Sequence, residues 1–383
     1  MIKIKISSAK KLEKIHWAWF SARMDEIAWP NNKSHKDFIF EKIKFLEKNE
    51  EGYDEITQNK LKLKRLQTLI IGDPNTEING EKIYDFFKKI NKKYKWHNIS
   101  AMSKKENETD SEFTDRKKIC EKDNKLTQDL QEAFGYNDFV ASPSKAQWYI
   151  DFKKKNNNKD WNIKVLNEKL NVDVCPYCNR QYIFGYDLAN KKRNIAEIDH
   201  FNPKSHYPFL SCSLYNFIPS CHTCNSIKQA QDKNILYPYT DSLDEYTKKE
   251  KNAVFTFKAK NGSQLTFPIN KKTQKKIELK INPNYSKKNE ADESKKLFHL
   301  DEIYSKHILE LNDIIERYEN CTPKQLQALY NFVTTNLQIN ISEENLKKLI
   351  LGLPINTTKE YPLRKFKEDI IDYLSKIDQN MAK

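Results

Sequence analysis

Two short cysteine motifs constrain this chain more than any other feature. Cys175-Pro-Tyr-Cys178 and Cys221-His-Thr-Cys224 are spaced like paired zinc knuckles and together offer four thiolates. Four sulfur ligands complete the tetrahedral coordination of Zn²⁺ and leave no open position, so such an ion is structural and not catalytic. The two motifs are further apart than in a simple zinc ribbon, so we expect a folded element between them.

The rest of the sequence favours metal binding over disulfides. Residues 1–6 alternate isoleucine with lysine, unlike the apolar core of a secretory signal, and no window reaches the ~18 apolar residues of a membrane helix. We therefore expect a cytoplasmic protein with no membrane partner. In a reducing compartment, paired cysteine motifs more often bind a metal ion than form disulfides. The remaining cysteines, Cys120, Cys212 and Cys321, are expected to be inert core residues.

Apolar spacing predicts a predominantly helical α+β fold. Apolar residues recur every three or four positions in many segments, which is typical of amphipathic helices, and the chain has only 7 glycines. Helices are expected within 8–24, 38–45, 61–70, 83–90, 126–134, 143–150, 297–315, 323–333 and 342–350. Strands are expected at 2–6 and up to residue 200, and Asn261-Gly262 predicts a hairpin that joins 254–259 to 265–267. The polar segment 103–118 is expected to be a loop.

These patterns divide the chain into four expected parts. Residues 1–142 form a mainly helical domain, and 143–240 hold the cysteine motifs and the candidate site. Residues 241–285 form a β-hairpin insert, and 286–383 form a helical region. The length of 383 residues by itself favours two or three folded units.

The charge of the chain points to a polyanionic partner. It carries 67 lysines and arginines against 53 acidic residues, a formal net charge of +14. Nucleic acid is the simplest partner for such a surface. A lysine-rich composition without any such partner explains the same charge equally well.

Between the two cysteine motifs, an acid stands beside a histidine. The alternation from Ile195 to His200 indicates the end of a strand, and Pro203 follows shortly. The carboxylate of Asp199 suits Mg²⁺ or Mn²⁺, and a neutral imidazole such as that of His200 can take a proton from water. Neighbouring strand residues point to opposite faces, so the two side chains need a bend to meet at one site.

One asparagine and two lysines extend the candidate site. Asn225 directly follows the last cysteine, and a helix that starts there would aim its amide oxygen at the site of Asp199. Lys228 shares a helical face with Asn225 and is, with Lys204, a candidate phosphate ligand, although solvated lysines fit the same pattern. His222 is interpreted as a packed or exposed histidine, because the four thiolates already complete the zinc site.

Taken together, the residues from the first knuckle to Lys228 resemble the HNH, or ββα-metal, endonuclease family, in its zinc-bearing branch. The resemblance implies a hairpin with a histidine, a middle asparagine and a closing helix, at His200, Asn216 and Asn225. It implies that His200 is the general base, that Asp199 and Asn225 hold one catalytic ion, and that Asn216 ties the loop to the hairpin. Asparagine rather than histidine at the third position favours Mg²⁺ or Mn²⁺ over a tightly held transition metal.

A looser resemblance concerns biological role. The segments 199–208 and 219–225 are similar to HNH proteins of bacterial anti-phage systems, such as the nuclease partner of an ATPase in Septu. This resemblance implies a defence effector with an ATPase partner, and the large helical flanks favour it, because an HNH core needs no such additions to cut.

The sequence thus predicts a metal-dependent endonuclease that hydrolyses phosphodiester bonds, with structural Zn²⁺, catalytic Mg²⁺ or Mn²⁺, and DNA favoured over RNA. Two alternatives remain open. One is an HNH nuclease that cleaves RNA or tRNA, and the other is a zinc-dependent nucleic-acid-binding module without catalysis. Metal-stimulated cleavage of nucleic acid distinguishes both nucleases from the binding module.

Overall fold

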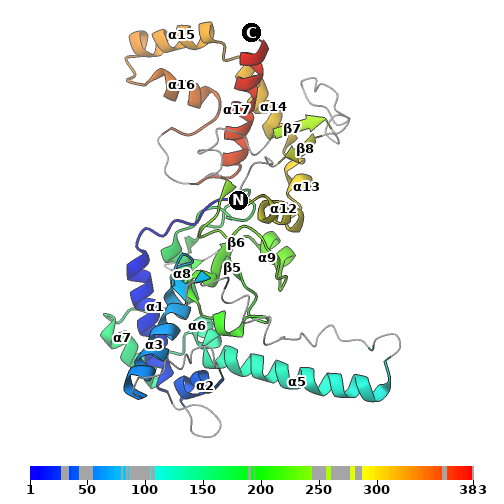
Figure 1. Ribbon diagram of the computed structural model, residues 1–383. Helices are drawn as coiled ribbons and strands as arrows, with labels where there is room; N and C mark the ends of the chain where they lie inside the picture. The colour runs from blue at the N-terminus through cyan, green and yellow to red at the C-terminus, as the bar shows by residue number, and fades with distance from the viewer. Residues whose placement is uncertain are drawn as a thin grey trace. The chain divides into compact units, whose positions relative to one another are not determined.

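The computed structural model describes residues 1–26, 34–42, 55–78, 81–82, 85, 104, 108–188, 191–193, 195–243, 256–259, 277–280, 287–355 and 360–381. Contacts divide the chain into two compact units, each built from separate segments. Unit 1 comprises Met1–Lys3, Asp173–Ile183 and Lys233–Lys383, and unit 2 comprises Ile4–Val172 and Phe184–Asp232. The described residues are predominantly helical with small antiparallel sheets, which confirms the expected predominance of helix (Figure 1). Among them, no helix combines the length and apolarity needed to cross a membrane.

Unit 2 combines helices with two-stranded sheets. Its helices are α1 (Ala9–Met24), α2 (His35–Lys42), α3 (Glu55–Ile71), α5 (Asp110–Ala133), α6 (Tyr136–Ala141), α7 (Gln147–Lys155), α8 (Ile163–Leu170) and α9 (His222–Lys228). Its strands pair antiparallel as β1 (Glu77–Ile78) with β2 (Glu81–Lys82), β3 (Tyr186–Leu188) with β4 (Lys191–Arg193), and β5 (Glu197–His200) with β6 (Phe217–Ser220).

An aromatic core joins the helices of unit 2 to the β5–β6 hairpin. Trp19 of α1 lies 4.9 Å from Phe139 of α6, which stacks on Phe217 of β6 at 5.5 Å between ring centroids. His16 is buried in the same core, where Nε2 donates to the carbonyl of Cys212 and Nδ1 accepts from Trp161 Nε1 at 3.0 Å. Burial lowers the pKa of His16 to about 4. The core therefore contains a neutral histidine with both ring nitrogens bonded, and it anchors the strand that leads to α9.

The hairpin and the helix after it form a strand–strand–helix sequence. In the antiparallel register, Asp199 faces Ile218 and His200 faces Phe217. Helix α9 begins at His222, inside the second knuckle, and not at Asn225 as expected. Cys221 is its N-cap and its sulfur accepts a hydrogen bond from the Cys224 N–H at 3.5 Å, so the knuckle itself starts the helix.

Several expectations for the N-terminal region were wrong. The first six residues form no strand, although Ile2 and Ile4 are buried; the N–H of Ile2 donates to the carbonyl of Pro176 in a loop. The segment 103–118 is not all loop, because α5 already starts at Asp110. A capping box explains this early start: the Thr109 hydroxyl accepts from the Glu112 N–H while the Glu112 carboxylate accepts from the Thr109 N–H.

The other N-terminal helix predictions had mixed outcomes. The helices expected within 8–24 and 61–70 are present as α1 and α3. The helix expected from Ser142-Pro143 begins later, at Gln147. The helix expected within 83–90 lies almost wholly outside the described residues.

Unit 1 contains the C-terminal helices, whose existence the apolar spacing predicted. They are α12 (Lys288–Leu297), α13 (Leu300–Tyr304), α14 (Ile308–Glu319), α15 (Pro323–Asn331), α16 (Glu343–Ile350) and α17 (Arg364–Met381), with a π-helical turn at Phe332–Asn336. Its two-stranded sheet pairs β7 (Thr256–Ala259) with β8 (Ile277–Lys280). The partner expected for β7 was 265–267, which lies with the Asn261-Gly262 turn outside the described residues.

Candidate functional site

The first cysteine knuckle is a tight turn held by several parts of unit 1. The N–H of Asn179 donates to the carbonyl of Cys175 at 2.8 Å, and Asn179 adopts the left-handed backbone region that asparagine tolerates, with φ 52°. The Tyr304 hydroxyl donates to the carbonyl of Cys178 at 2.6 Å, and the N–H of Leu363 donates to the carbonyl of Asn179 at 2.7 Å. The turn is therefore held in shape by hydrogen bonds to its backbone that do not involve its thiolates.

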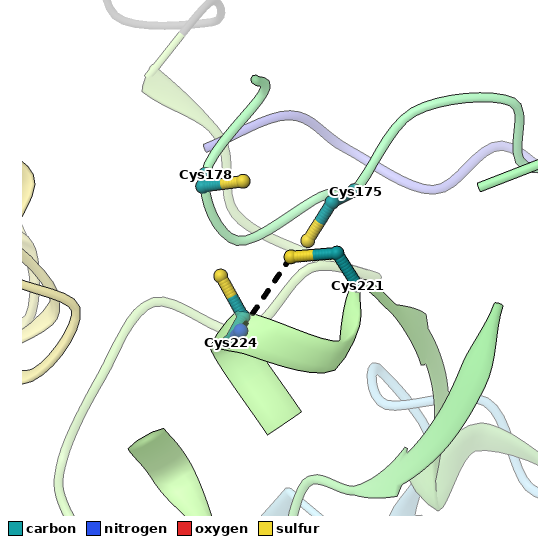
Figure 2. Close-up of side chains that lie close together, drawn as sticks. All are labelled: Cys175, Cys178, Cys221 and Cys224. Atoms are coloured by element: carbon teal, nitrogen blue, oxygen red, sulfur yellow. Dashed lines mark hydrogen bonds between the residues drawn. The ribbon is translucent and has the colours of Figure 1, made fainter. Parts of the chain in front are cut away.

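The four knuckle cysteines form one cluster. The sulfur atoms of Cys175, Cys178, Cys221 and Cys224 all lie within 4.8 Å of one another, and all four residues are buried (Figure 2). Zn–S bonds of about 2.3 Å in a tetrahedron place the sulfurs about 3.8 Å apart, which this cluster accommodates. The cluster could therefore bind zinc, and its four soft sulfurs suit that ion better than a hard cation.

A cavity in unit 2 brings three of the expected site residues together. Asp199, His200 and Asn225 all line a space of about 670 Å³. Other lining residues come from α5 and from the start of α6, which lie far earlier in the chain. The rest of the lining includes Thr127, Gln128, Gln131, Tyr136, Lys204, Ser205 and Gln229.

His200 is buried and neutral, and one of its ring nitrogens is already hydrogen-bonded to the backbone. Its Nε2 lies 3.0 Å from the carbonyl oxygen of Ser211 and must donate to it, because a carbonyl can only accept. Nδ1 therefore carries the lone pair. The rings of Tyr136 and Phe217 meet the imidazole edge-to-face at 4.9 and 5.2 Å, which restrains its orientation. Burial lowers the pKa of His200 to about 3, with smaller contributions from nearby lysines.

Asn216 links the two ends of the loop between β5 and β6. Its amide oxygen accepts from the Asn202 N–H at 2.8 Å, and its amide nitrogen donates to the carbonyls of Asn202 and Leu210 at 3.0 and 3.1 Å. Its own carbonyl accepts from the Phe201 N–H at 2.9 Å. The side chain is fully buried, so these bonds fix the loop just after His200.

Asp199 is paired with a buried lysine. Both of its carboxylate oxygens lie 3.1 Å from Nζ of Lys228, which also donates to the carbonyl of His200 at 2.8 Å. Lys228 is only 1% exposed. The sequence left Lys228 as either a phosphate ligand or a solvated lysine; its burial rules out the solvated alternative, and it lies outside the cavity lining. Burial lowers the pKa of its amine, while Asp199 acts in the opposite direction.

Asn225 is oriented by an acid at the start of β5. Its amide nitrogen donates to the carboxylate of Glu197 at 2.7 Å, and the other oxygen of Glu197 lies 2.7 Å from Nδ1 of His222. Both hydrogen bonds lower the pKa of Glu197, and the one from Asn225 has the larger effect. The contact leaves the amide oxygen of Asn225 as the atom available to a cation. His222 is 80% exposed, in agreement with its interpretation as an exposed histidine.

Lys204 lies against an aromatic ring at the cavity wall. Its amine sits 3.7 Å from the centroid of the Tyr136 ring, and its carbonyl accepts from Gln131 Nε2 at 2.8 Å. Burial lowers the pKa of Lys204. Lys204 thus lines the same cavity as His200 and Asp199.

Comparison with known proteins gives one partial match. Part of the chain is similar to Septu protein PtuB of Bacillus thuringiensis. The two are 28% identical over 100 residues, which is 24% of this chain and 36% of that protein's length. No family model matches the chain, and no solved structure matches it. The similarity is distant, and the match spans about a third of its relative.

Sequence reasoning missed some of the residues that shape the cavity. Glu197 lies two positions before Asp199 in the same strand, and such residues share a face of a strand. This spacing could have identified Glu197 as a neighbour of the candidate site. Tyr136 and the α5 residues carry no such signal, because they are distant in sequence from the motif. The pairing of Lys228 with Asp199 also has no local sequence signature.

Proposed function

We propose that this protein is a metal-dependent HNH endonuclease that hydrolyses phosphodiester bonds, with DNA as the favoured substrate. The observation that carries the proposal is the shared cavity of Asp199, His200 and Asn225. Their supporting elements follow the order strand, strand and helix, as a ββα-metal core requires. The four-cysteine cluster beside the start of α9 supports the zinc-bearing branch of the family.

His200 is the proposed general base. Its Nε2–H is held by Ser211, so Nδ1 is the atom that takes a proton from water. A pKa of about 3 keeps the imidazole neutral at neutral pH, but it also makes a weak base. A phosphate anion bound beside the ring favours its protonated form and raises this pKa towards the working range. Asn216 holds the loop that follows His200, and so maintains the position of the base.

Asp199 and Asn225 are the proposed ligands of one catalytic Mg²⁺ or Mn²⁺. The donor set fits a hard cation: a carboxylate and an amide oxygen line one cavity, and Glu197 turns the Asn225 amide so that its nitrogen is engaged. Such an ion supplies electrostatic stabilisation of the charge that develops on the phosphate oxygens. Lys204, also in the lining, is placed to contact a neighbouring phosphate of the nucleic acid.

We further propose a role in anti-phage defence together with an ATPase partner, in the cytoplasm. The similarity to Septu protein PtuB supports a defence role. The helical segments that precede and follow the site in the sequence are the proposed surface for this partner. The division of the chain into residues 1–142, 143–240, 241–285 and 286–383 is also a proposal.

Replacement of the base tests the enzymatic proposal. His200→Ala should reduce metal-dependent cleavage of plasmid DNA by at least about 10²-fold, as expected when a general base is removed. His299→Asn is a matched control, since His299 is exposed and asparagine tolerates its φ of 49°. Cleavage should need Mg²⁺ or Mn²⁺ and should stop with a chelator. Full activity of the His200→Ala protein would contradict the mechanism.

The same assay separates the alternatives. Metal-stimulated cleavage of total RNA or tRNA, with DNA left intact, would identify an RNA nuclease. Binding of nucleic acid without any metal-stimulated cleavage would identify a zinc-dependent binding module.

A further inference from the structure

The contact between Lys228 and Asp199 bears on how the catalytic ion is bound. Nζ of Lys228 lies 3.1 Å from both carboxylate oxygens of Asp199, and the two side chains are 1% and 4% exposed. The amine is also fixed by the carbonyl of His200 at 2.8 Å. Water and salt screen such a buried pair poorly. Asp199, the proposed ligand of the divalent cation, therefore already has the ammonium group of Lys228 beside it.

The cavity lining does little to offset this positive charge. Among the described residues that line the cavity, Asp199 is the carboxylate and Lys204 supplies an ammonium group, while Lys228 lies outside the lining and is bonded to Asp199. A second carboxylate, Asp232, also acts on Lys228, but it lies outside the lining and accepts a hydrogen bond from the Tyr207 hydroxyl at 2.8 Å. Glu197, the neighbouring carboxylate on β5, is already engaged by Asn225 and His222 at 2.7 Å each. A divalent ion that enters alone is therefore repelled by two lysines while it competes for one paired carboxylate.

We propose that Lys228 makes binding of the divalent cation at Asp199 conditional on bound nucleic acid. A phosphodiester in the cavity supplies the negative charge that the wall lacks, and it offsets the repulsion between the ion and the lysines. Metal and nucleic acid then bind cooperatively, and each raises the affinity for the other by the same factor. The inference rests on the proposed function, because it takes Asp199 as a metal ligand.

The consequence is a site that is assembled by its substrate. Without nucleic acid, Lys228 holds Asp199 in place and keeps the buried carboxylate neutralised. With nucleic acid bound, the same carboxylate would hold the ion, while Lys228 keeps its hydrogen bond to the carbonyl of His200. Lys228 is therefore a positioning residue that sets when the ion binds, and it does not contact the reacting atoms.

Direct measurement of Mn²⁺ binding tests this inference without any use of activity. The full chain with His200→Ala is titrated with Mn²⁺, with and without a short DNA oligonucleotide, and free Mn²⁺ is measured by electron paramagnetic resonance. The oligonucleotide should raise Mn²⁺ affinity by about tenfold or more, within the usual range of coupling between sites. Adding Lys228→Met should raise the affinity by about tenfold without oligonucleotide and should remove most of the oligonucleotide's effect.

Two further substitutions serve as controls. Lys228→Arg keeps the positive charge and should keep the coupling. Lys145→Met removes the same charge from an exposed position outside the cavity lining and should change neither affinity nor coupling. Equal Mn²⁺ affinity with and without oligonucleotide in the lysine-containing protein would overturn the inference. Unchanged or weaker Mn²⁺ binding by a folded Lys228→Met protein would also overturn it.

Failure of this inference is distinguishable from failure of the proposed function. Asp199→Asn should abolish Mn²⁺ binding, and if it does not, the proposed metal site itself is wrong. If Asp199→Asn abolishes binding but no coupling is seen, the role of Lys228 alone is wrong. Circular dichroism and zinc content report whether the Lys228→Met protein is folded; if it is not, the oligonucleotide comparison in the lysine-containing protein decides.

Discussion

At the scale of single residues, the candidate site depends on buried polar side chains whose partners are specific. His200, Asn216 and Lys228 are each nearly or fully buried, and each is bonded to a backbone carbonyl of the loop or strand that positions it. A buried polar group that loses its partner carries the full cost of desolvation. Substitution at such positions should therefore affect stability as well as chemistry, and the two effects must be measured separately.

Asn216 offers a stability test of this kind. Asn216→Ala removes three side-chain hydrogen bonds, to the N–H and carbonyl of Asn202 and to the carbonyl of Leu210, in a fully buried position. At about 1 kcal/mol for each bond, the free energy of unfolding should fall by about 3 kcal/mol. Urea denaturation measures the change. Asn320→Ala is the control, since Asn320 makes an exposed bond to Glu316, and a similar loss in both variants would contradict the structural role of Asn216.

His16 provides a pH-dependent test in the core of unit 2. Its pKa is about 4 in the folded protein, because it is buried, and near 6.5 when unfolded. Between these values the unfolded chain binds the proton and the folded protein does not, so stability falls as pH decreases from 6.5 to 4. This residue accounts for a loss of up to about 3 kcal/mol over that window.

Comparison of two proteins isolates the contribution of His16 from those of other groups that titrate. Urea denaturation at pH 6.5 and pH 4.5 should show a smaller acid-induced loss in His16→Gln than in the unsubstituted chain. His206→Gln, which removes a histidine outside this aromatic core, is the control. Parallel losses in the His16→Gln and unsubstituted proteins would mean that His16 is not the buried neutral group described above.

At the scale of elements, the second knuckle and α9 form one structural piece. Cys221 is at once a member of the four-cysteine cluster and the N-cap of α9. Serine is a strong N-cap, so Cys221→Ser preserves the start of the helix while it removes one of the four candidate zinc ligands. We expect this variant to lose the bound zinc and to melt at a lower temperature, because structural zinc contributes directly to folding.

Zinc content by elemental analysis and thermal melting measure these effects together. Cys212→Ser is the matched control, since Cys212 is buried but lies outside the cluster, and it should retain its zinc. If the Cys221→Ser protein keeps as much zinc as the control, the cluster is not the zinc site.

The elements also show what the sequence could and could not predict. The second knuckle, the Asp199-His200 pair and Asn225 were identifiable because one hairpin and the short helix after it carry them over a limited stretch of chain. The wall formed by α5 and Tyr136 was not identifiable, because tertiary packing between distant segments creates it. The pairing of β7 with β8 was missed for a related reason. The Asn-Gly turn signal indicates only a strand partner directly after the turn, and β8 lies further along the chain.

At the scale of the whole molecule, the net charge of +14 makes any binding to nucleic acid strongly electrostatic. Each phosphate that a lysine neutralises releases condensed counterions from the nucleic acid. The logarithm of the binding constant therefore falls linearly with the logarithm of salt concentration, with a slope of about −0.9 for each phosphate contact on duplex DNA. The slope thus counts phosphate contacts, and it separates a lysine that contacts DNA from one that is merely solvated.

Lys204 should be one of the lysines that the slope counts, because its amine stands at the wall of the cavity. In the His200→Ala protein, used so that cleavage by the proposed mechanism does not interfere, Lys204→Met should make the salt dependence of duplex DNA binding shallower by about 0.9. Lys145→Met, which removes an equal charge at an exposed position outside the lining, should leave the slope unchanged. Fluorescence anisotropy over a range of salt concentrations measures both slopes. Identical slopes for Lys204→Met and its parent would show that the cavity wall does not contact the DNA backbone, and the substrate would then have to approach His200 from another side.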